Sequence, residues 1–260
     1  MNTVWAIAFV VILELIRKKD FYVLFVLTAL ITLVMGTVNF FNDDNIVRYL
    51  KEICLLLIWI SSLVISISTA ARQVPAEKEN RTIFPLLAKP VTRAQLLLGK
   101  FLGCWLACGL ALVLFYVFFG AVAASREHAW PVAHYFQALV LHWAALAVII
   151  ALTLAGSIVL AAPSSTVTIT FVVVAGILYL GGHLDKVALR TGGVAGVALH
   201  VIYFVIPHLE LFANVRDLII HNWPLVPWLV WFGALLYAAV YAAIFLLIAW
   251  LLFRRKALNI

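Results

Sequence analysis

The sequence predicts an all-α polytopic membrane protein, and two observations carry this prediction. Hydrophobic residues make up 66% of the 260 residues, and charged residues only 11%. A soluble globular domain is closer to about half apolar and about a quarter charged, and a body of this size has too little interior to hide the excess apolar surface. The apolar residues also gather in runs of roughly 20, the length of a membrane-spanning helix. A soluble enzyme, a secreted disulfide scaffold and a disordered protein are therefore excluded.

Six apolar segments meet or approach the length of a span, and the fifth of them is short. They cover residues 21–41, 53–71, 101–124, 135–162, 167–182 and 227–253. They predict six transmembrane helices within a single transmembrane domain over residues 1–260.

Two further apolar stretches are too short to span comfortably. The apolar residues 3–16 are followed by the basic residues Arg17, Lys18 and Lys19, so we expect residues 1–19 to form an N-terminal interfacial elbow helix. The alternative is a seventh, short membrane span. Residues 193–209 contain two glycines, Gly193 and Gly196, and are broken by Pro207. We expect a re-entrant or surface helical pair there, within an external segment over 183–225, because irregular backbone at membrane depth must be shielded by protein or water.

The basic residues predict the orientation of the chain. With the N-terminus inside, twelve Lys and Arg residues fall on inner segments and six on outer ones, and Lys and Arg favour the cytoplasmic side. The net charge of +7 is thus a topological marker, and no nucleic acid is expected as a partner. The sequence predicts a multi-pass protein of the inner, cytoplasmic membrane, with both termini in the cytoplasm.

Residues 72–100 are the most charged part of the chain and have a detailed pattern. Pro75 precedes an expected charged turn over 77–79, a short apolar helix is expected over 83–88, and Pro90 should end it. Thr92 and Gln95 match a capping box, so a new helix should begin near Thr92 and continue into the third span. Gly99 and Gly103 have the GxxxG spacing that allows close packing of helices. The pattern predicts a cytoplasmic loop that is rigid and charged at its tip; an ordinary solvated loop is the alternative.

The same loop resembles the first cytoplasmic loop of ABC-2 type transporter permeases. The resemblance rests on about 25 residues, with an acidic start at Glu77 and Glu79, then Arg81-Thr82-Ile83, Leu86-Leu87, Pro90-Val91-Thr92-Arg93 and a terminal Gly99-Lys100. It is closest to the six-span group that includes NosY-like and gliding-motility permeases. The layout of the chain agrees, with an elbow helix, six spans and a long external segment between the fifth and sixth spans.

The resemblance implies that this loop is a coupling helix that docks in a cleft of a cytoplasmic ABC ATPase. It places Glu77, Glu79, Arg81 and Thr82 at or near the contact, Leu86 and Leu87 in the packing of the helix, and Pro90 and Arg93 at its exit. Pro85 departs from the family pattern, because a proline inside the short helix removes a backbone donor. The segment 206–212 also resembles a proline-containing stretch before the last span in these permeases, for which we expect a role in gating or in lining the external end.

The remaining polar residues give weaker signals. All seven histidines follow residue 120 and lack metal-binding spacing, so we expect them at the membrane interfaces, together with tryptophans that include Trp143 and Trp231. Cys104 and Cys108 are interpreted as buried small side chains rather than metal ligands. Charged residues within the spans are nearly absent, which argues against an ion pathway and favours an amphiphilic or apolar substrate.

These features predict the permease subunit of an ABC-2 type exporter. The chain has no GxxxxGK[ST] pattern, so we expect it to hold no cofactor itself and to be no enzyme; ATP and Mg²⁺ would be bound by a partner ATPase. The other expected partners are a second permease copy, most simply as a homodimer, the lipid bilayer, and periplasmic or accessory subunits. Two alternatives stay open: a non-transporting anchor through which an ATPase acts mechanically on other proteins, and a polytopic membrane enzyme.

Overall fold

The computed structural model of the chain describes residues 3–17, 22, 26, 28–34, 44–79, 91–127, 131–160 and 162–255. For residues 44–47, 50, 76–79, 126, 127 and 185 it describes the backbone alone. All regular secondary structure in these ranges is helical, as the sequence predicts.

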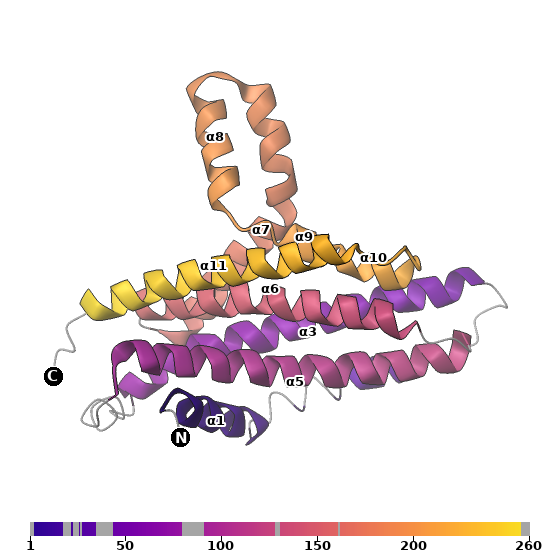
Figure 1. Cartoon of the computed structure of the whole chain (residues 1–260), viewed down its shortest axis with the longest axis horizontal. Coiled ribbons are helices and arrows are strands. Elements are labelled where there is room, and N and C mark those ends of the chain that lie inside the picture. Colours follow the sequence, from indigo (N-terminus) through magenta and orange to yellow (C-terminus); the bar gives the residue numbers. More distant parts are fainter. Residues whose placement is uncertain are drawn as a thin grey trace.

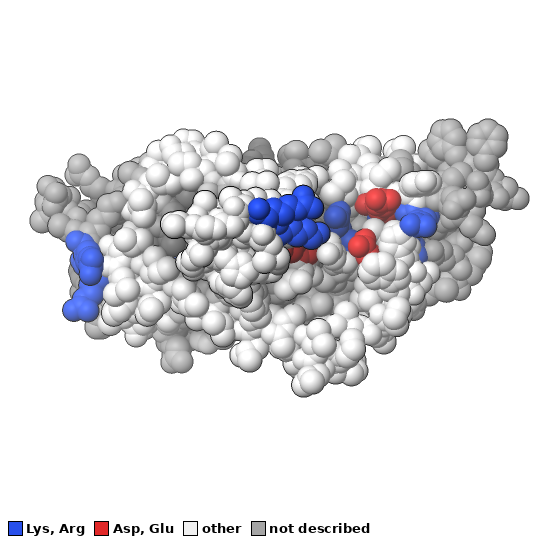
Figure 2. All heavy atoms as spheres, turned by 90° about the horizontal axis from the view of Figure 1, so that it is seen from above, with Lys and Arg blue, Asp and Glu red and all other residues white. Residues whose placement is uncertain are grey.

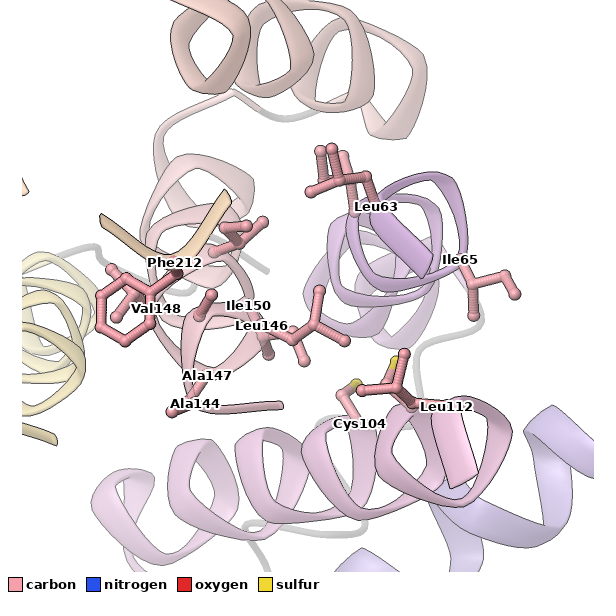
Figure 3. Packing of buried hydrophobic residues seen from close by; sticks show 14 of the residues in the cluster. Leu63, Ile65, Cys104, Leu112, Ala144, Leu146, Ala147, Val148, Ile150 and Phe212 are labelled. Atoms are coloured by element: carbon pink, nitrogen blue, oxygen red, sulfur yellow. The ribbon is translucent and has the colours of Figure 1, made fainter. Parts of the chain in front are cut away.

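Three long helices form the centre of the molecule. They are α3 (Asp44–Glu79), α5 (Arg93–Glu127) and α6 (Val132–Val159), and they lie side by side along the long axis (Figure 1). Helices α3 and α5 exceed the spans predicted for them, because charged and polar residues that favour helix continue them beyond their apolar parts. Helix α6 begins and ends three residues before its predicted span. Figure 3 shows Leu63 of α3 and Leu112 of α5 in the apolar core around Leu146 of α6. Helix α6 is buried along most of its length.

The glycine pair in α5 packs against α1 (Thr3–Arg17). A Cβ atom at Gly99 would lie 2.7 Å from Cβ of Ile7, and one at Gly103 would lie 2.6 Å from Cβ of Val11. Only glycine therefore allows the two helices to approach so closely, which confirms the packing role predicted for the GxxxG spacing. Helix α1 has 15 residues and is too short to cross a bilayer comfortably; its place at the membrane surface stays a prediction.

The second half of the chain contains a hairpin that projects from the bundle. Helix α7 (Pro163–Thr191) is followed by α8 (Gly193–Val205), and their ends rise together away from the other helices (Figure 1). Gly192 and Gly193 make the turn at φ 62° and 60°, a region that strongly favours glycine. The chain returns through two short helices, α9 (Glu210–Ala213) and α10 (Val215–Ile220), to α11 (Trp228–Arg255), which lies along α6.

Five of the described helices are long and apolar enough to cross a membrane. They are α7, α11 and the three central helices, and α8 with the α9–α10 segment passes as a sixth candidate, bent by 52° at its break. This pair is the region for which the sequence predicts a re-entrant arrangement. The predicted first span, 21–41, lies largely outside the described residues, although residues 28–34 are helical and Thr28 Oγ1 lies 3.0 Å from Ser61 Oγ of α3. The chain is a multi-pass membrane protein.

The outer faces of α7, α8 and α11 agree with a lipid environment. Large apolar side chains such as Val172, Val194 and Leu229 are exposed there, and Figure 2 shows charged residues only in a few small patches on a mostly uncharged surface. In water such a surface would be unfavourable, but in a bilayer it costs nothing.

One local prediction about the charged loop is wrong. The sequence analysis expects a turn at 77–79, but α3 continues as a helix through Pro75 to Glu79. Glutamate and lysine are good helix formers, and the loss of one backbone donor at Pro75 does not outweigh the rest of a 36-residue helix. The acidic residues therefore stand on a helical extension of the bundle.

Candidate coupling region and buried polar network

The predicted coupling residues lie between α3 and α5, and the structure describes them unequally. Glu77 and Glu79 occupy the last turn of α3 as backbone only. Five of them, Arg81, Thr82, Leu86, Leu87 and Pro90, fall outside the described residues, as does the expected short helix over 83–88. Arg93 is the first residue of α5.

The start of α5 has the geometry that the sequence predicts. The backbone N–H of Thr92 donates to Gln95 Oε1 over 2.9 Å, and the backbone N–H of Gln95 donates to Thr92 Oγ1 over 3.2 Å. This reciprocal pair satisfies two donors that the helix itself cannot satisfy. The end of the charged loop is thus fixed firmly to the start of a spanning helix.

Arg93 connects this helix start to the end of α11. Its Nη1 donates to the carbonyl oxygens of Phe253 (2.7 Å) and Arg254 (3.1 Å), and its guanidinium lies 5.4 Å from the centre of the Phe253 ring. The last carbonyls of a helix have no partner within the helix, and a cation there also interacts favourably with the helix dipole. The loop exit is therefore attached to both α5 and α11.

A chain of buried polar side chains joins α3, α5 and α6. His142 of α6 is 2% exposed; its Nε2 lies 2.9 Å from Ser62 Oγ, its Nδ1 lies 3.3 Å from the Tyr116 hydroxyl, and its ring stacks on Trp59. The Ser62 hydroxyl donates its proton to the carbonyl of Trp59 over 2.8 Å. His142 Nε2 must then donate to Ser62, and Nδ1 accepts from Tyr116. Every group in this chain is satisfied with the histidine neutral.

This network corrects the sequence analysis, which places all seven histidines at the membrane interfaces. Ser62 and His142 are 80 residues apart, so no local spacing could pair them. The available signal was a single ionisable residue within an apolar run, which is a reason to suspect a function or a partner inside a membrane protein. The direction of the hydrogen bonds argues against a hydrolase, because Nε2 donates to Ser62 instead of accepting its proton.

Two tryptophans clamp α5 to α6. The indole N–H of Trp105 donates to the carbonyl of Trp143, and that of Trp143 donates to the carbonyl of Trp105, each over 3.0 Å. The rings stack with centres 4.4 Å apart, and a Cβ at Gly109 would overlap the Trp143 ring. Trp143 is thus an interhelical residue, and so is the buried Trp231, whose Nε1 donates to the Gln137 carbonyl over 3.4 Å. Both depart from the interfacial role predicted for them.

The segment before α11 is fixed to α6 by Gln137. Its side-chain amide accepts from the backbone N–H of Val226 and donates to the carbonyl of the same residue, each over 3.0 Å. Lys51, which the charge count places on an outer segment, is 1% exposed in α3, and its Nζ donates to the carbonyl of Ile219 in α10 over 3.4 Å. These two contacts hold one end of the bundle, and the contact of Arg93 with α11 holds the opposite end.

The comparisons with known proteins agree with this architecture. A comparison with curated proteins finds no match. The family model described as ABC-2 family transporter protein matches residues 3–258, which is nearly the whole chain. This match agrees with the long apolar helices and with the capped helix start after the charged loop. The chain therefore belongs to the ABC-2 family of transporter proteins, which are the membrane-spanning permease components that work with an ABC ATPase.

Proposed function

We propose that this permease exports a lipid-like, glycan or other amphiphilic substrate, driven by a separate cytoplasmic ATPase that docks on the loop between α3 and α5. The ATPase would bind ATP and Mg²⁺, and Glu77, Glu79, Arg81 and Thr82 would lie at its contact. Leu86 and Leu87 would pack the coupling helix, and Pro90 and Arg93 would fix its exit.

The observation that carries the proposal is the attachment of Arg93 to the end of α11. A displacement of the loop would move α5 directly. It would also move α11, because Arg93 is hydrogen-bonded to two carbonyl oxygens at the end of that helix. Helix α3 continues without a break to Glu79, so a force at its tip would act along a stiff rod. The hydrogen bonds of His142 connect α3, α5 and α6, and the stacked pair of Trp105 and Trp143 connects α5 to α6. These three helices would therefore move together as one rigid body. Switching by movement of packed, rigid elements is an established type of transition.

A second permease copy would complete the transporter, most simply as a homodimer in the inner membrane with both termini in the cytoplasm. The apolar walls of the molecule support an amphiphilic substrate, which would move along the interface between the copies. Periplasmic or accessory subunits would join at the external end.

The test is co-purification with the ATPase encoded beside the gene. Glu79→Ala with Arg81→Ala should weaken ATPase binding roughly tenfold, since a contact of this kind depends on a few residues. The matched control is Arg48→Ala with Glu52→Ala, which removes one charge of each sign from exposed positions at the other end of α3. Unchanged binding and ATPase activity in the first pair would refute the assignment.

A proteoliposome assay separates export from a purely mechanical role. ATP-dependent movement of a fluorescent amphiphile across the bilayer supports export. Normal ATPase binding and ATP hydrolysis without any movement of amphiphiles would favour an anchor that acts on other envelope proteins.

A further inference from the structure

Glu210 lies where the α7–α8 hairpin joins the bundle, in the proline-containing segment that the sequence analysis singles out. It is the first residue of α9, and its carboxylate rests against two consecutive glycines of α7. A Cβ at Gly181 would overlap Oε2 of Glu210, and a Cβ at Gly182 would lie 3.5 Å from Oε1. The two glycines therefore leave the space that the carboxylate occupies.

One oxygen of this carboxylate is buried without a partner. Oε2 of Glu210 has almost no accessible surface, and no donor among the described residues reaches it. A buried carboxyl oxygen without a hydrogen-bond partner is costly, so it calls for an explanation, and a bound ion or ligand group is one such explanation.

The residues beside Glu210 form an aromatic cluster, defined by Tyr203, His208, Tyr237 and Tyr241. The Tyr237 hydroxyl accepts from the backbone N–H of His208 over 2.9 Å and lies 3.1 Å from its Nδ1. The ring of Tyr203 lies 4.4 Å from that of His208, and the rings of Tyr237 and Tyr241 are 4.7 Å apart. Glu210 follows His208 by two residues, and both lie in the turn that the backbone N–H of Leu211 closes on the His208 carbonyl over 3.3 Å, so Glu210 and the cluster are neighbours along the chain.

The hydrogen bonds within the cluster decide its chemical character. The Tyr237 hydroxyl accepts from the backbone N–H of His208 and also lies within hydrogen-bond distance of its Nδ1, so the polar groups of this pair are already engaged with each other. The groups that remain available are then a carboxylate and the faces of tyrosine rings. Both are electron-rich, and both attract cations, most strongly where water is scarce.

We propose that Glu210 and the aromatic cluster bind the ammonium head of a cationic or zwitterionic amphiphile. A divalent metal ion would need several oxygen ligands, and the part of the chain that the structure describes has no group of three metal-binding side chains. An ammonium head needs one counter-charge and aromatic faces, and its apolar tail would lie along the exposed apolar surfaces of α8 and α11. The site rests on the proposed function only in that its ligand would be the exported substrate.

The experiment measures thermal stability without the ATPase, so its outcome is independent of coupling and transport. The purified permease in a neutral maltoside detergent is titrated with dodecyltrimethylammonium, and with its neutral isostere in which carbon replaces nitrogen. A ligand that binds the folded state raises the melting temperature. We expect a saturable rise with the ammonium compound alone. Equal rises with both compounds, or none with either, would overturn the proposal.

Four variants locate the site. Glu210→Gln, which keeps the shape of the side chain, and Gly181→Ala, which displaces the carboxylate, should each weaken binding about tenfold. Glu52→Gln removes an exposed carboxylate from α3 and should leave binding unchanged. Tyr241→Leu removes one ring of the cluster and should also weaken binding. Because each shift is measured against the same variant without ligand, altered basal stability does not mask the result; wild-type binding in Glu210→Gln would refute the site.

Discussion

At the scale of single residues, His142 joins three helices through one donor and one acceptor. Its partners Ser62 and Tyr116 are buried as well. We expect His142→Ala to lower the free energy of unfolding by about 1–3 kcal/mol, because it leaves buried polar groups unsatisfied and opens a cavity. The measurement is the unfolding midpoint in detergent, with exposed His183→Ala as the control that should change little.

The direction of the hydrogen bonds gives a second prediction at this scale. Tyr116→Phe removes the donor to Nδ1, and Ser62→Ala removes the acceptor of Nε2, so each should cost about 1 kcal/mol. Because both act through the same imidazole, their effects should not add in a double-mutant cycle. Strict additivity would show that the two side chains do not form one chain with His142.

At the scale of helices, the glycines of α5 and α11 should respond to the same substitution with opposite signs. Alanine is a better helix former than glycine by about 1 kcal/mol. At Gly233 of α11 a Cβ would meet nothing within 4 Å, so Gly233→Ala should stabilise the protein by up to that amount. At Gly103 the Cβ would meet Val11 and the backbone of Ala8, so Gly103→Ala should destabilise it. A higher melting temperature for Gly103→Ala would show that α1 does not dock there.

The sequence predicts a feature well when the residues that produce it lie close together in the chain, and poorly when they lie far apart. The capping box at Thr92 and Gln95 needs three residues of separation, and the structure confirms it. The GxxxG spacing predicts close packing, but its partner in α1 lies about 90 residues away in the sequence, so sequence reasoning could not name it. Contacts between distant helices, such as those of His142 with Ser62 and of Arg93 with Phe253, have no local signature and only the fold brings them together.

At the scale of the whole molecule, Arg93 should be needed for coupling more than for assembly. It holds the end of α11 at the exit of the proposed coupling loop. We expect Arg93→Ala to retain the ATPase but to lower transport per ATP hydrolysed about tenfold. Arg93→Lys should restore only part of it, because an ammonium lacks the planar fork and the stacking on Phe253. Arg255→Ala, at an exposed position in the last turn of α11, is the control.

The topology of the whole chain can be tested with single cysteines. The three native cysteines are buried, so they should give little background with a membrane-impermeant maleimide. In the predicted topology, the exposed Leu225 precedes α11 on the outside, whereas Lys78 and Arg255 lie in the cytoplasm. Leu225→Cys should therefore be labelled in intact cells, and Lys78→Cys and Arg255→Cys only after permeabilisation. Labelling of all three from one side would contradict α11 as a membrane span. Labelling of Lys78→Cys and Arg255→Cys from opposite sides would contradict the joint anchoring of the coupling loop by α5 and α11, because Arg93 and the end of α11 must lie on the same side to be in contact.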